Sequence, residues 1–318
     1  MSVDVVTLGE TLLRLSLPLG TRFQGLGGLT TSIGGAESNV AVAVAQMGCS
    51  VAWVSAVPDN DLGHHVLAQL GSLGVDTQFV HILPGSRLGI YFVEPGSAPR
   101  PTRVIYDRKE AAVTRLESSD VPWEVIESAK AVHITGITPA LSDSLRELSI
   151  EFTRRARSSN VSVCVDVNYR SHLWAVEEAK PILLELCQGA TLAILTEEDA
   201  RYVFGFEGPP RDLIRKAQDT FAAQYVALTV GSRGALLCDA KGIVEQPGVE
   251  AAVVDRIGCG DAFAAGLVLG VVRGDVAGYL PTAVGMAALK LGIRGDHFSG
   301  SQVDIDGILT GDRREVNR

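Results

Sequence analysis

The sequence lacks the features that mark membrane and exported proteins. No segment reaches the roughly 18 consecutive apolar residues that a transmembrane helix requires. The first residues carry neither the basic segment nor the long apolar run of a signal peptide. We therefore expect no membrane partner and a cytoplasmic location.

The sequence also has few cysteines and fewer basic than acidic residues. The 5 cysteines are far apart, with no Cys-x-x-Cys pair, and the 6 histidines show no spacing typical of metal ligands. Disulfides and a zinc site are thus not expected, which fits a reducing compartment. The formal net charge is −9 and no basic segment stands out, so a nucleic-acid-binding protein is not expected either.

Common nucleotide-binding motifs are missing. There is no Gly-Lys dipeptide, which excludes a Walker A loop, and no Gly-x-Gly-x-x-Gly follows the first predicted strand. The His-Arg-Asp and Asp-Phe-Gly elements of protein kinases are absent too. If this chain binds ATP, it does so by another design.

What the sequence does contain is a regular alternation of strands and helices. It predicts strands at residues 3–8, 51–55, 131–135, 161–167, 192–195 and 226–230, and helices at 36–47, 61–73, 141–158, 176–188, 210–223, 261–273 and 281–291. Such alternation predicts an α/β fold with a mostly parallel sheet covered by helices on both faces. Ligands of such sheets bind beyond the carboxyl ends of the strands.

Two segments, residues 11–33 and 87–113, depart from this strand–helix alternation and are predicted to be strand–turn–strand insertions. They divide the chain into an α/β core of residues 1–10, 34–86 and 114–318 and a smaller β unit made of the two insertions. The insertions can pair as a small sheet that covers the active site, or they can be separate surface hairpins. The pattern alone does not decide between these alternatives.

The most informative motif is Asp255-Arg-Ile-Gly258-Cys-Gly260-Asp261, followed by an apolar run of small residues at 262–270. A glycine loop that opens a helix exposes amides which bind anions. Asp261 lies at the same helix terminus, either as a simple cap or as a general base beside a phosphate cradle. The second reading predicts phosphoryl transfer to a hydroxyl.

Two further motifs supply candidate ligand-binding residues. Gly34-Gly35 precedes the helix that carries Asn39, and a double glycine permits either a close ligand approach or a plain capping turn. Asp166, Asn168 and Arg170 share one face of an extended chain, where Arg170 can bind a carboxylate or phosphate, or form a structural ion pair with Asp166.

The remaining candidates lie on a strand end and in the second insertion. The glycine turn of Thr229-Val-Gly231-Ser232-Arg-Gly234 suits a nucleotide, and equally an ordinary hairpin. Tyr91, Tyr106 and Arg108 could close over a substrate, or could be ordinary strand residues.

Taken together, Gly34-Gly35-x-x-x-Asn39 and Asp255-x-x-Gly258-x-Gly260-Asp261 resemble the paired signatures of PfkB/ribokinase-type carbohydrate kinases, over nearly the whole chain. The resemblance implies a ribokinase-like fold with a small β-sheet lid, ATP as phosphoryl donor and Mg²⁺ as cofactor. Within that family, the segment from Asp166 to Trp174 is similar to 2-keto-3-deoxygluconate kinases. The implied reaction is phosphorylation of this sugar acid at its terminal primary hydroxyl, giving the 6-phosphate.

The resemblance also implies a role for each candidate. Asp261 is the general base, and the amides of Gly258, Cys259 and Gly260 form the anion hole. The substrate-binding candidates are Gly34, Gly35, Asn39, Tyr91, Tyr106, Arg108 and Arg170. The cofactor-binding candidates are Asn168, Thr229, Gly231, Ser232, Gly234, Gly258 and Gly260.

This sequence departs from the family pattern where an Asn-x-x-Glu element is usual, because it has Thr196-Glu-Glu-Asp199. Asp199 is the metal-ligand candidate there. Two alternatives remain open: a ketose kinase of the tagatose or fructose type, and a degenerate sugar-kinase-like sensor. Lid sheets with open edges often pair between subunits, so a homodimer through the lid is expected.

Overall fold

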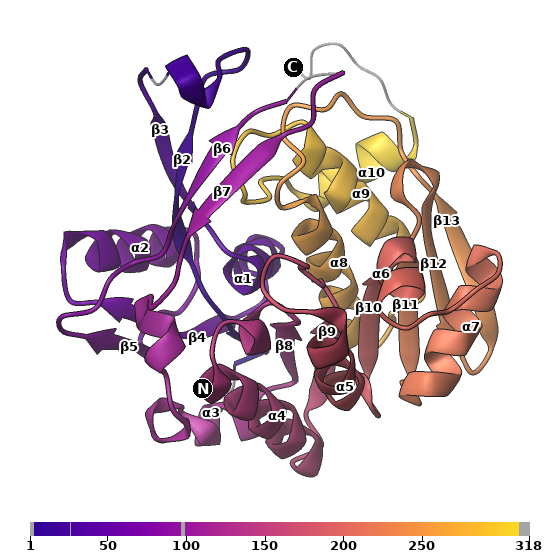
Figure 1. The fold of residues 1–318 in the computed structure, drawn as a ribbon. Helices are drawn as coiled ribbons and strands as arrows, with labels where there is room; N and C mark the ends of the chain where they lie inside the picture. The colour runs from indigo at the N-terminus through magenta and orange to yellow at the C-terminus, as the bar shows by residue number, and fades with distance from the viewer. Residues whose placement is uncertain (1–2, 26, 97–98, 312–318) are drawn as a thin grey trace.

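The protein is described by a computed structural model that covers residues 3–25, 27–96 and 99–311. Nine strands form the main sheet in the order β13-β12-β11-β10-β9-β8-β1-β4-β5 (Figure 1). The pairs from β11 through β5 are parallel, and β12 and β13 extend the sheet in antiparallel fashion. The carboxyl ends of the parallel strands therefore meet at one edge, where the candidate residues gather.

The main-sheet strands are β1 (Val5–Leu8), β4 (Val51–Pro58), β5 (Val80–Leu83), β8 (Ala131–Thr135), β9 (Ser162–Asp166), β10 (Leu192–Thr196), β11 (Tyr225–Thr229), β12 (Gly234–Asp239) and β13 (Gly242–Pro247). The helices are α1 (Ala36–Gln46), α2 (Asp61–Ser72), α3 (Trp123–Glu127), α4 (Asp143–Ser158), α5 (Val176–Cys187), α6 (Glu197–Tyr202), α7 (Pro210–Phe221), α8 (Cys259–Arg273), α9 (Leu280–Leu291) and α10 (Gln302–Leu309).

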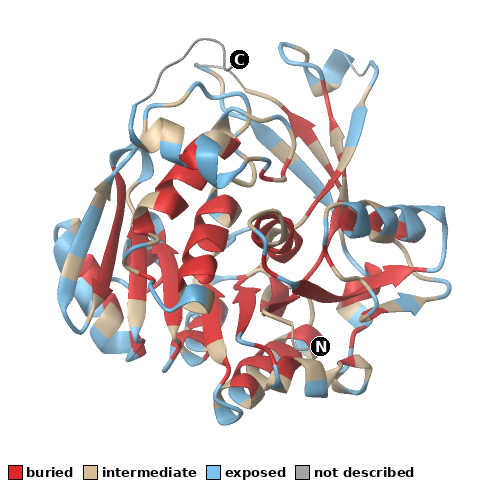
Figure 2. Cartoon of the chain, turned by 180° about the vertical axis from the view of Figure 1, so that it is seen from behind, coloured by how far each residue is buried: buried red, intermediate tan, exposed pale blue. Residues whose placement is uncertain are grey.

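Helices cover both faces of the main sheet because its strands are apolar on both sides. On β1, Val6 and Leu8 pack into the core shared with α4, α5 and α7, whereas Val5 packs into the core shared with α1, α8 and α9. This alternation follows the two-residue period of a strand. Figure 2 shows the sheet and α8 as the buried centre of the molecule.

The two insertions pair into one small sheet with the order β3-β2-β6-β7. Its strands are β2 (Leu12–Ser16), β3 (Thr30–Gly34), β6 (Ile90–Glu94) and β7 (Arg103–Asp107). Each insertion is an antiparallel hairpin, and β2 joins the two hairpins by pairing with β6 in parallel. The small sheet projects from the core (Figure 1), so the two insertions pair with each other and are not separate surface hairpins.

The helix predictions are confirmed to within two residues at each end, as α1, α2, α4, α5, α7, α8 and α9. The strand β5, the hairpin β12–β13 and the short helices α3, α6 and α10 had no prediction. The predicted core and lid boundaries stay predictions, and their residues 1–2, 26, 97–98 and 312–318 lie outside the described residues. Within the described part of the chain, no helix has the length and apolarity needed to cross a membrane.

Candidate active site

The site is built around the start of α8, as the glycine loop predicts. Gly258 is the residue that precedes the helix, and its φ of 88° is a conformation that favours glycine. A Cβ there would also lie 2.0 Å from the carbonyl oxygen of Asp296. The loop thus turns sharply into a helix whose first-turn amides point out of its N-terminus, where an anion is favoured.

Asp261 lies in the first turn of α8, and its Oδ2 accepts a hydrogen bond of 2.6 Å from Nδ2 of Asn39 on α1. Burial raises the pKa of Asp261 to about 7, and the nearby Asp296 and Glu37 carboxylates add to this rise. The Asn39 hydrogen bond and Arg170 act in the opposite direction. A carboxyl whose pKa lies near neutrality is well matched to general-base work.

Two more carboxylates lie at this edge of the sheet: Asp166 ends β9, and Asp199 lies in the first turn of α6, which follows the neighbouring strand β10. Burial and the negative charges of Asp199 and Asp261 raise the pKa of Asp166 well above its usual value, while Arg170 lowers it. Burial also raises the pKa of Asp199. These carboxylates share one countercharge, the exposed Arg170. An exposed guanidinium facing three carboxylates is placed to meet an anionic ligand.

The lid contributes an aromatic pair and an arginine. The rings of Tyr91 on β6 and Tyr106 on β7 stack at 5.7 Å between centroids. The Arg108 guanidinium lies 5.3 Å from the Tyr106 ring centre and forms an ion pair with the buried Glu10, at the end of β1. The structure therefore brings these three candidates together, with Glu10 as a partner that sequence reasoning did not identify.

The double glycine at 34–35 lies where chain segments cross. A Cβ on Gly34 would lie 2.2 Å from Oδ2 of Asp296, and one on Gly35 would lie 1.9 Å from the carbonyl oxygen of Glu10. These contacts alone require glycine at both positions. Contact of Gly34 and Gly35 with a substrate stays a prediction.

The nucleotide-side candidates lie next to a cavity at the ends of β10 and β11. The cavity has a volume of about 790 Å³ and is lined by Thr196, Glu197, Glu198, Arg201, Tyr202, Thr229, Val230 and Gly231. Ser232 is exposed beside it, and Gly234 opens β12, where its Cβ would lie 2.0 Å from the Gln246 carbonyl oxygen. Arg201 and Tyr202 of α6 are cavity residues that the sequence did not single out.

The unusual Thr196–Asp199 element forms a capping box. Thr196 Oγ1 accepts from the Asp199 amide at 2.9 Å, and Asp199 Oδ2 accepts from the Thr196 amide at 3.0 Å and from its hydroxyl at 2.8 Å. Asp199 therefore has one carboxylate oxygen engaged in starting α6. Its negative charge also acts on Asp166, whose pKa it helps to raise. Asn168, with a φ of 37°, donates its amide to Asp166 Oδ1 at 3.1 Å.

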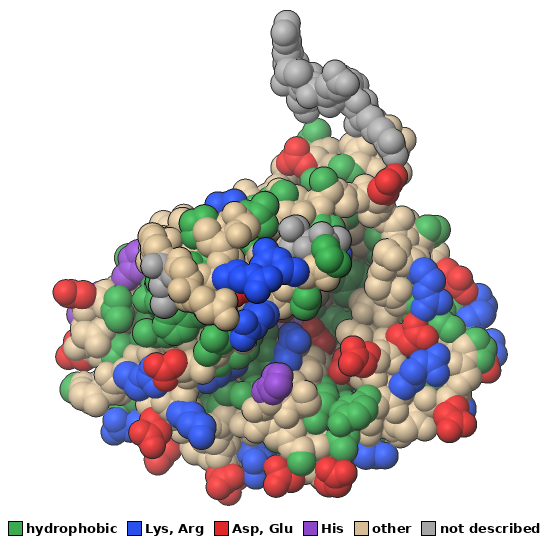
Figure 3. Space-filling view, turned by 45° about the horizontal axis from the view of Figure 1, so that its top comes forward, with side chains coloured by type: hydrophobic (Ala, Val, Ile, Leu, Met, Phe, Trp, Pro, Cys, Tyr) green, Lys and Arg blue, Asp and Glu red, His purple; other side chains and the backbone are tan. Residues whose placement is uncertain are grey.

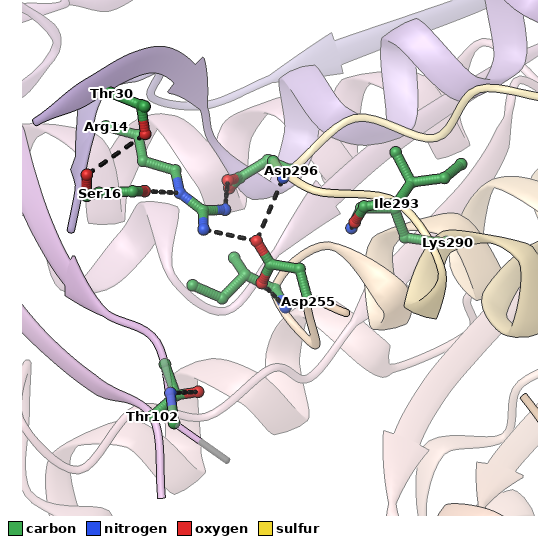
Figure 4. A network of polar contacts seen from close by, with 11 residues as sticks. Arg14, Ser16, Thr30, Thr102, Asp255, Lys290, Ile293 and Asp296 are labelled. Carbon is green, nitrogen blue, oxygen red and sulfur yellow. Dashed lines mark hydrogen bonds and ion pairs between the residues drawn. The ribbon is translucent and has the colours of Figure 1, made fainter. Parts of the chain in front are cut away.

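A buried ion cluster joins the lid to the α8 loop (Figure 4). Arg14 of β2 donates to Asp255 Oδ2 at 2.5 Å, to Asp296 Oδ1 at 2.6 Å and to Ser16 Oγ at 2.7 Å. The partners are 241 and 282 residues away from Arg14 in the sequence. No local pattern could have linked residues so far apart.

Figure 3 shows the molecule with the top of the Figure 1 view turned forward. The surface is hollowed there, and side chains of both charges lie around the hollow. The site thus combines a helix start whose free amides favour an anion, a buried carboxyl with a pKa of about 7, and arginines from both the core and the lid. Such a set can hold a phosphoryl donor against a hydroxyl acceptor.

The comparisons with known proteins agree with this geometry. The family model described as pfkB family carbohydrate kinase matches residues 4–300. A 2-dehydro-3-deoxygalactonokinase from Haloferax volcanii is 37% identical over 100% of both chains. The chain therefore belongs to the pfkB family of carbohydrate kinases and is a phosphotransferase with an alcohol group as acceptor.

Solved structures extend the likeness to the whole fold. The crystal structure of a 2-dehydro-3-deoxygluconokinase from Thermotoga maritima has a TM-score of 0.91 at 30% identity, covering 98% of this chain and 99% of that one. An uncharacterized sugar kinase from Pyrococcus horikoshii, solved in complex with ATP, has a TM-score of 0.80 at 25% identity, covering 92% and 93%.

Proposed function

We propose that this carbohydrate kinase transfers the γ-phosphoryl group of ATP to the terminal primary hydroxyl of a 2-keto-3-deoxy sugar acid. The observation that carries the proposal is Asp261, a carboxyl with a pKa of about 7 in the first turn of a glycine-initiated helix. It can take the hydroxyl proton while the amides at the helix start stabilise the charge of the transferred group.

Asn39 fixes the base in place. Its hydrogen bond to Oδ2 leaves Oδ1 of Asp261 to receive the proton of the acceptor hydroxyl. The Gly258, Cys259 and Gly260 amides are the proposed anion hole. Burial and Asp261 raise the pKa of the Cys259 thiol, so Cys259 stays protonated and does not compete as a nucleophile.

The arginines support an acidic acceptor. Arg170 is exposed beside the Asp261 carboxyl, and Arg108 reaches the site from the lid above Tyr106. A guanidinium binds a carboxylate through two parallel hydrogen bonds, an arrangement that a neutral ketose cannot offer. The Haloferax and Thermotoga relatives are named for 2-keto-3-deoxy acids, of the galacto and gluco configurations respectively, which supports the same class here.

The nucleotide is proposed to occupy the cavity at the ends of β10 and β11, which Thr229 and Gly231 line. The residues present fit Mg²⁺, which is usually held by one or two carboxylates together with phosphates and water. Asp166 and Asp199 would supply those carboxylates, and the described residues hold no preformed cage of three or more such ligands. When bound, the ion would offset the charge of the phosphates.

A coupled ADP-release assay over a panel of acceptors tests the proposal. We expect turnover with 2-keto-3-deoxygluconate or 2-keto-3-deoxygalactonate, dependence on Mg²⁺, and kcat/KM at least about tenfold lower for tagatose and fructose. Turnover of a neutral ketose with equal or better kcat/KM would overturn the sugar-acid assignment. No turnover with any acceptor would favour a degenerate sensor.

Arg170 provides the sharper test of the acceptor. In Arg170→Met, KM for the sugar acid should rise about tenfold or more, because a charged hydrogen-bonded pair is lost. The KM for ATP should change little. Arg146 is a matched control, since it pairs with Asp143 on the exposed side of α4. If KM for ATP rises instead, Arg170 binds phosphate.

We propose in addition that the enzyme works in the cytoplasm as a homodimer that pairs through the lid. The five free cysteines support a reducing compartment. The lid carries an apolar row, Leu15, Phe92 and Ile105, on the face opposite Tyr106, and an exposed apolar row can pair with a second copy.

A further inference from the structure

We propose that Arg14 is a positioning residue for phosphoryl transfer. It fixes the position of the anion-hole loop, residues 255–260, relative to the lid. The inference rests on the proposed role of the 258–260 amides. Arg14 touches neither of the proposed reactants; it acts through Asp255 and Asp296.

Asp255 shapes the loop that leads into α8. Its Oδ1 accepts a hydrogen bond of 3.1 Å from the Ile257 amide, and its Oδ2 accepts one of 3.1 Å from the Gly295 amide. Arg14 donates to the same Oδ2. Asp255 thus ties together its own loop, the segment before Asp296 and the lid strand β2.

Asp296 forms the other wall of the loop. Its carbonyl oxygen would lie 2.0 Å from a Cβ on Gly258, so the two backbones are in direct contact at the start of the anion hole. Its carboxylate lies against Gly34 and accepts the second Arg14 hydrogen bond. A shift of Asp296 would therefore move the loop, the end of β3 and the surroundings of Asp261 together.

Arg14 is the only described arginine that bridges two buried carboxylates. It is 1% exposed, and its two partners and Ser16 are buried or nearly so. Ser16 lies two residues along the same strand and accepts from Nε, which fixes the plane of the guanidinium. All three guanidinium nitrogens of Arg14 (Nε, Nη1 and Nη2) donate hydrogen bonds. A lysine ammonium cannot reproduce this planar geometry.

Stability alone gives a weak reason for this cluster. A buried ion pair is often replaceable by apolar residues at no loss of stability, because desolvation offsets the attraction. A fixed geometry is a stronger reason, since a displacement of about 1 Å near the reacting atoms can cost about 100-fold in rate. Arg14 links β2, which pairs with the Tyr91 strand β6, to the loop that precedes Asp261. The position of the lid and that of the anion hole are thereby coupled.

Arg14→Lys tests the inference, because it keeps the charge but cannot make the three directed contacts. We expect kcat to fall about tenfold or more while the Kd for ATP, measured by calorimetry, stays within about threefold. Binding of ADP with fluoroaluminate, an analogue of the transferring phosphoryl group, should weaken by the same factor as kcat. Arg87→Lys is the matched control, since Arg87 pairs with Asp107 within the lid insertion.

Ser16→Ala is the milder variant if Arg14→Lys does not fold. It removes the Nε contact and retains both ion pairs, so kcat should fall about two- to fivefold with unchanged ATP affinity. A lowered melting temperature with wild-type kcat in either folded variant would overturn the inference. The cluster would then contribute to stability and not to catalysis. Failure of the proposed function is seen separately, as absence of turnover in the wild-type enzyme. It would overturn the inference too.

Discussion

At the scale of single residues, the chemistry depends on Asp261. If Asp261 takes the acceptor proton, Asp261→Asn should lower kcat by at least about 100-fold, because an amide cannot act as a base. The Kd for ATP should stay nearly unchanged. Single-turnover kinetics and calorimetry on the same preparation check both quantities. Wild-type turnover by a pure Asn variant would contradict the mechanism.

The pKa of Asp261 also predicts a pH dependence. The carboxylate is the active form, so kcat/KM should rise with pH through a midpoint near the Asp261 pKa of about 7. The charged groups that face it are Asp166, Asp296, Glu37 and Arg170, and Asn39 donates a hydrogen bond that lowers the pKa. Asn39→Ala should therefore move the midpoint to higher pH, with a larger loss of activity at pH 6 than at pH 9.

Asn60→Ala is the control for this pH profile. Asn60 caps α2 by accepting from two amides, so its loss lowers stability without reaching the site. Its profile should keep the wild-type midpoint. A midpoint that Asn39→Ala leaves unchanged would mean that the observed titration belongs to another group.

At the scale of elements, α8 is fixed by its small residues. A Cβ on Gly266 would lie 2.4 Å from the Cα of Ala283 on α9, so the two helices are in backbone contact there. Gly266→Ala should therefore lower the free energy of unfolding by about 1–3 kcal/mol through overpacking. Gly71→Ala on α2 is the control, because its Cβ meets nothing within 4 Å and alanine favours helix.

Chemical denaturation measures the free energy of unfolding of both variants. A Gly266→Ala enzyme as stable as wild type would show that α8 and α9 can separate at little cost. Because α8 presents Asp261, we also expect its kcat to fall, whereas Gly71→Ala should keep full activity.

The elements differ in how far their sequences predict them. Strands such as β9 and helices such as α4 carry clear periodic patterns, so their places were predicted. The hairpin β12–β13 was not, because β13 has no buried residue, no two-residue burial period and little apolar content. In the site, motifs predicted Asp261 and Asn39, which meet across 222 residues. Glu10 and Arg14 had no such signal, since their partners are defined only once the chain is folded.

At the scale of the whole molecule, the lid has two different faces. Tyr91 and Tyr106 stack on the face toward the core, whereas the pairing register places Leu15, Phe92 and Ile105 in one row on the opposite face. Ile105 is 46% exposed. Leu15 and Phe92 are half-buried, and such a partly exposed apolar row on a small sheet is typical of a surface that pairs with another copy.

We therefore expect the protein to be a homodimer in solution and Ile105→Lys to shift it to monomer, because a charge would be placed in the paired apolar row. Sedimentation velocity over a range of concentrations measures the mass. Val303→Lys is the control, since Val303 on α10 is 73% exposed and lies outside the lid. A wild-type monomer, or equal dissociation of both variants, would contradict pairing through the lid. If the dimer also positions the lid, Ile105→Lys should raise KM for the sugar acid more than KM for ATP, because the lid holds Arg108 and the two tyrosines.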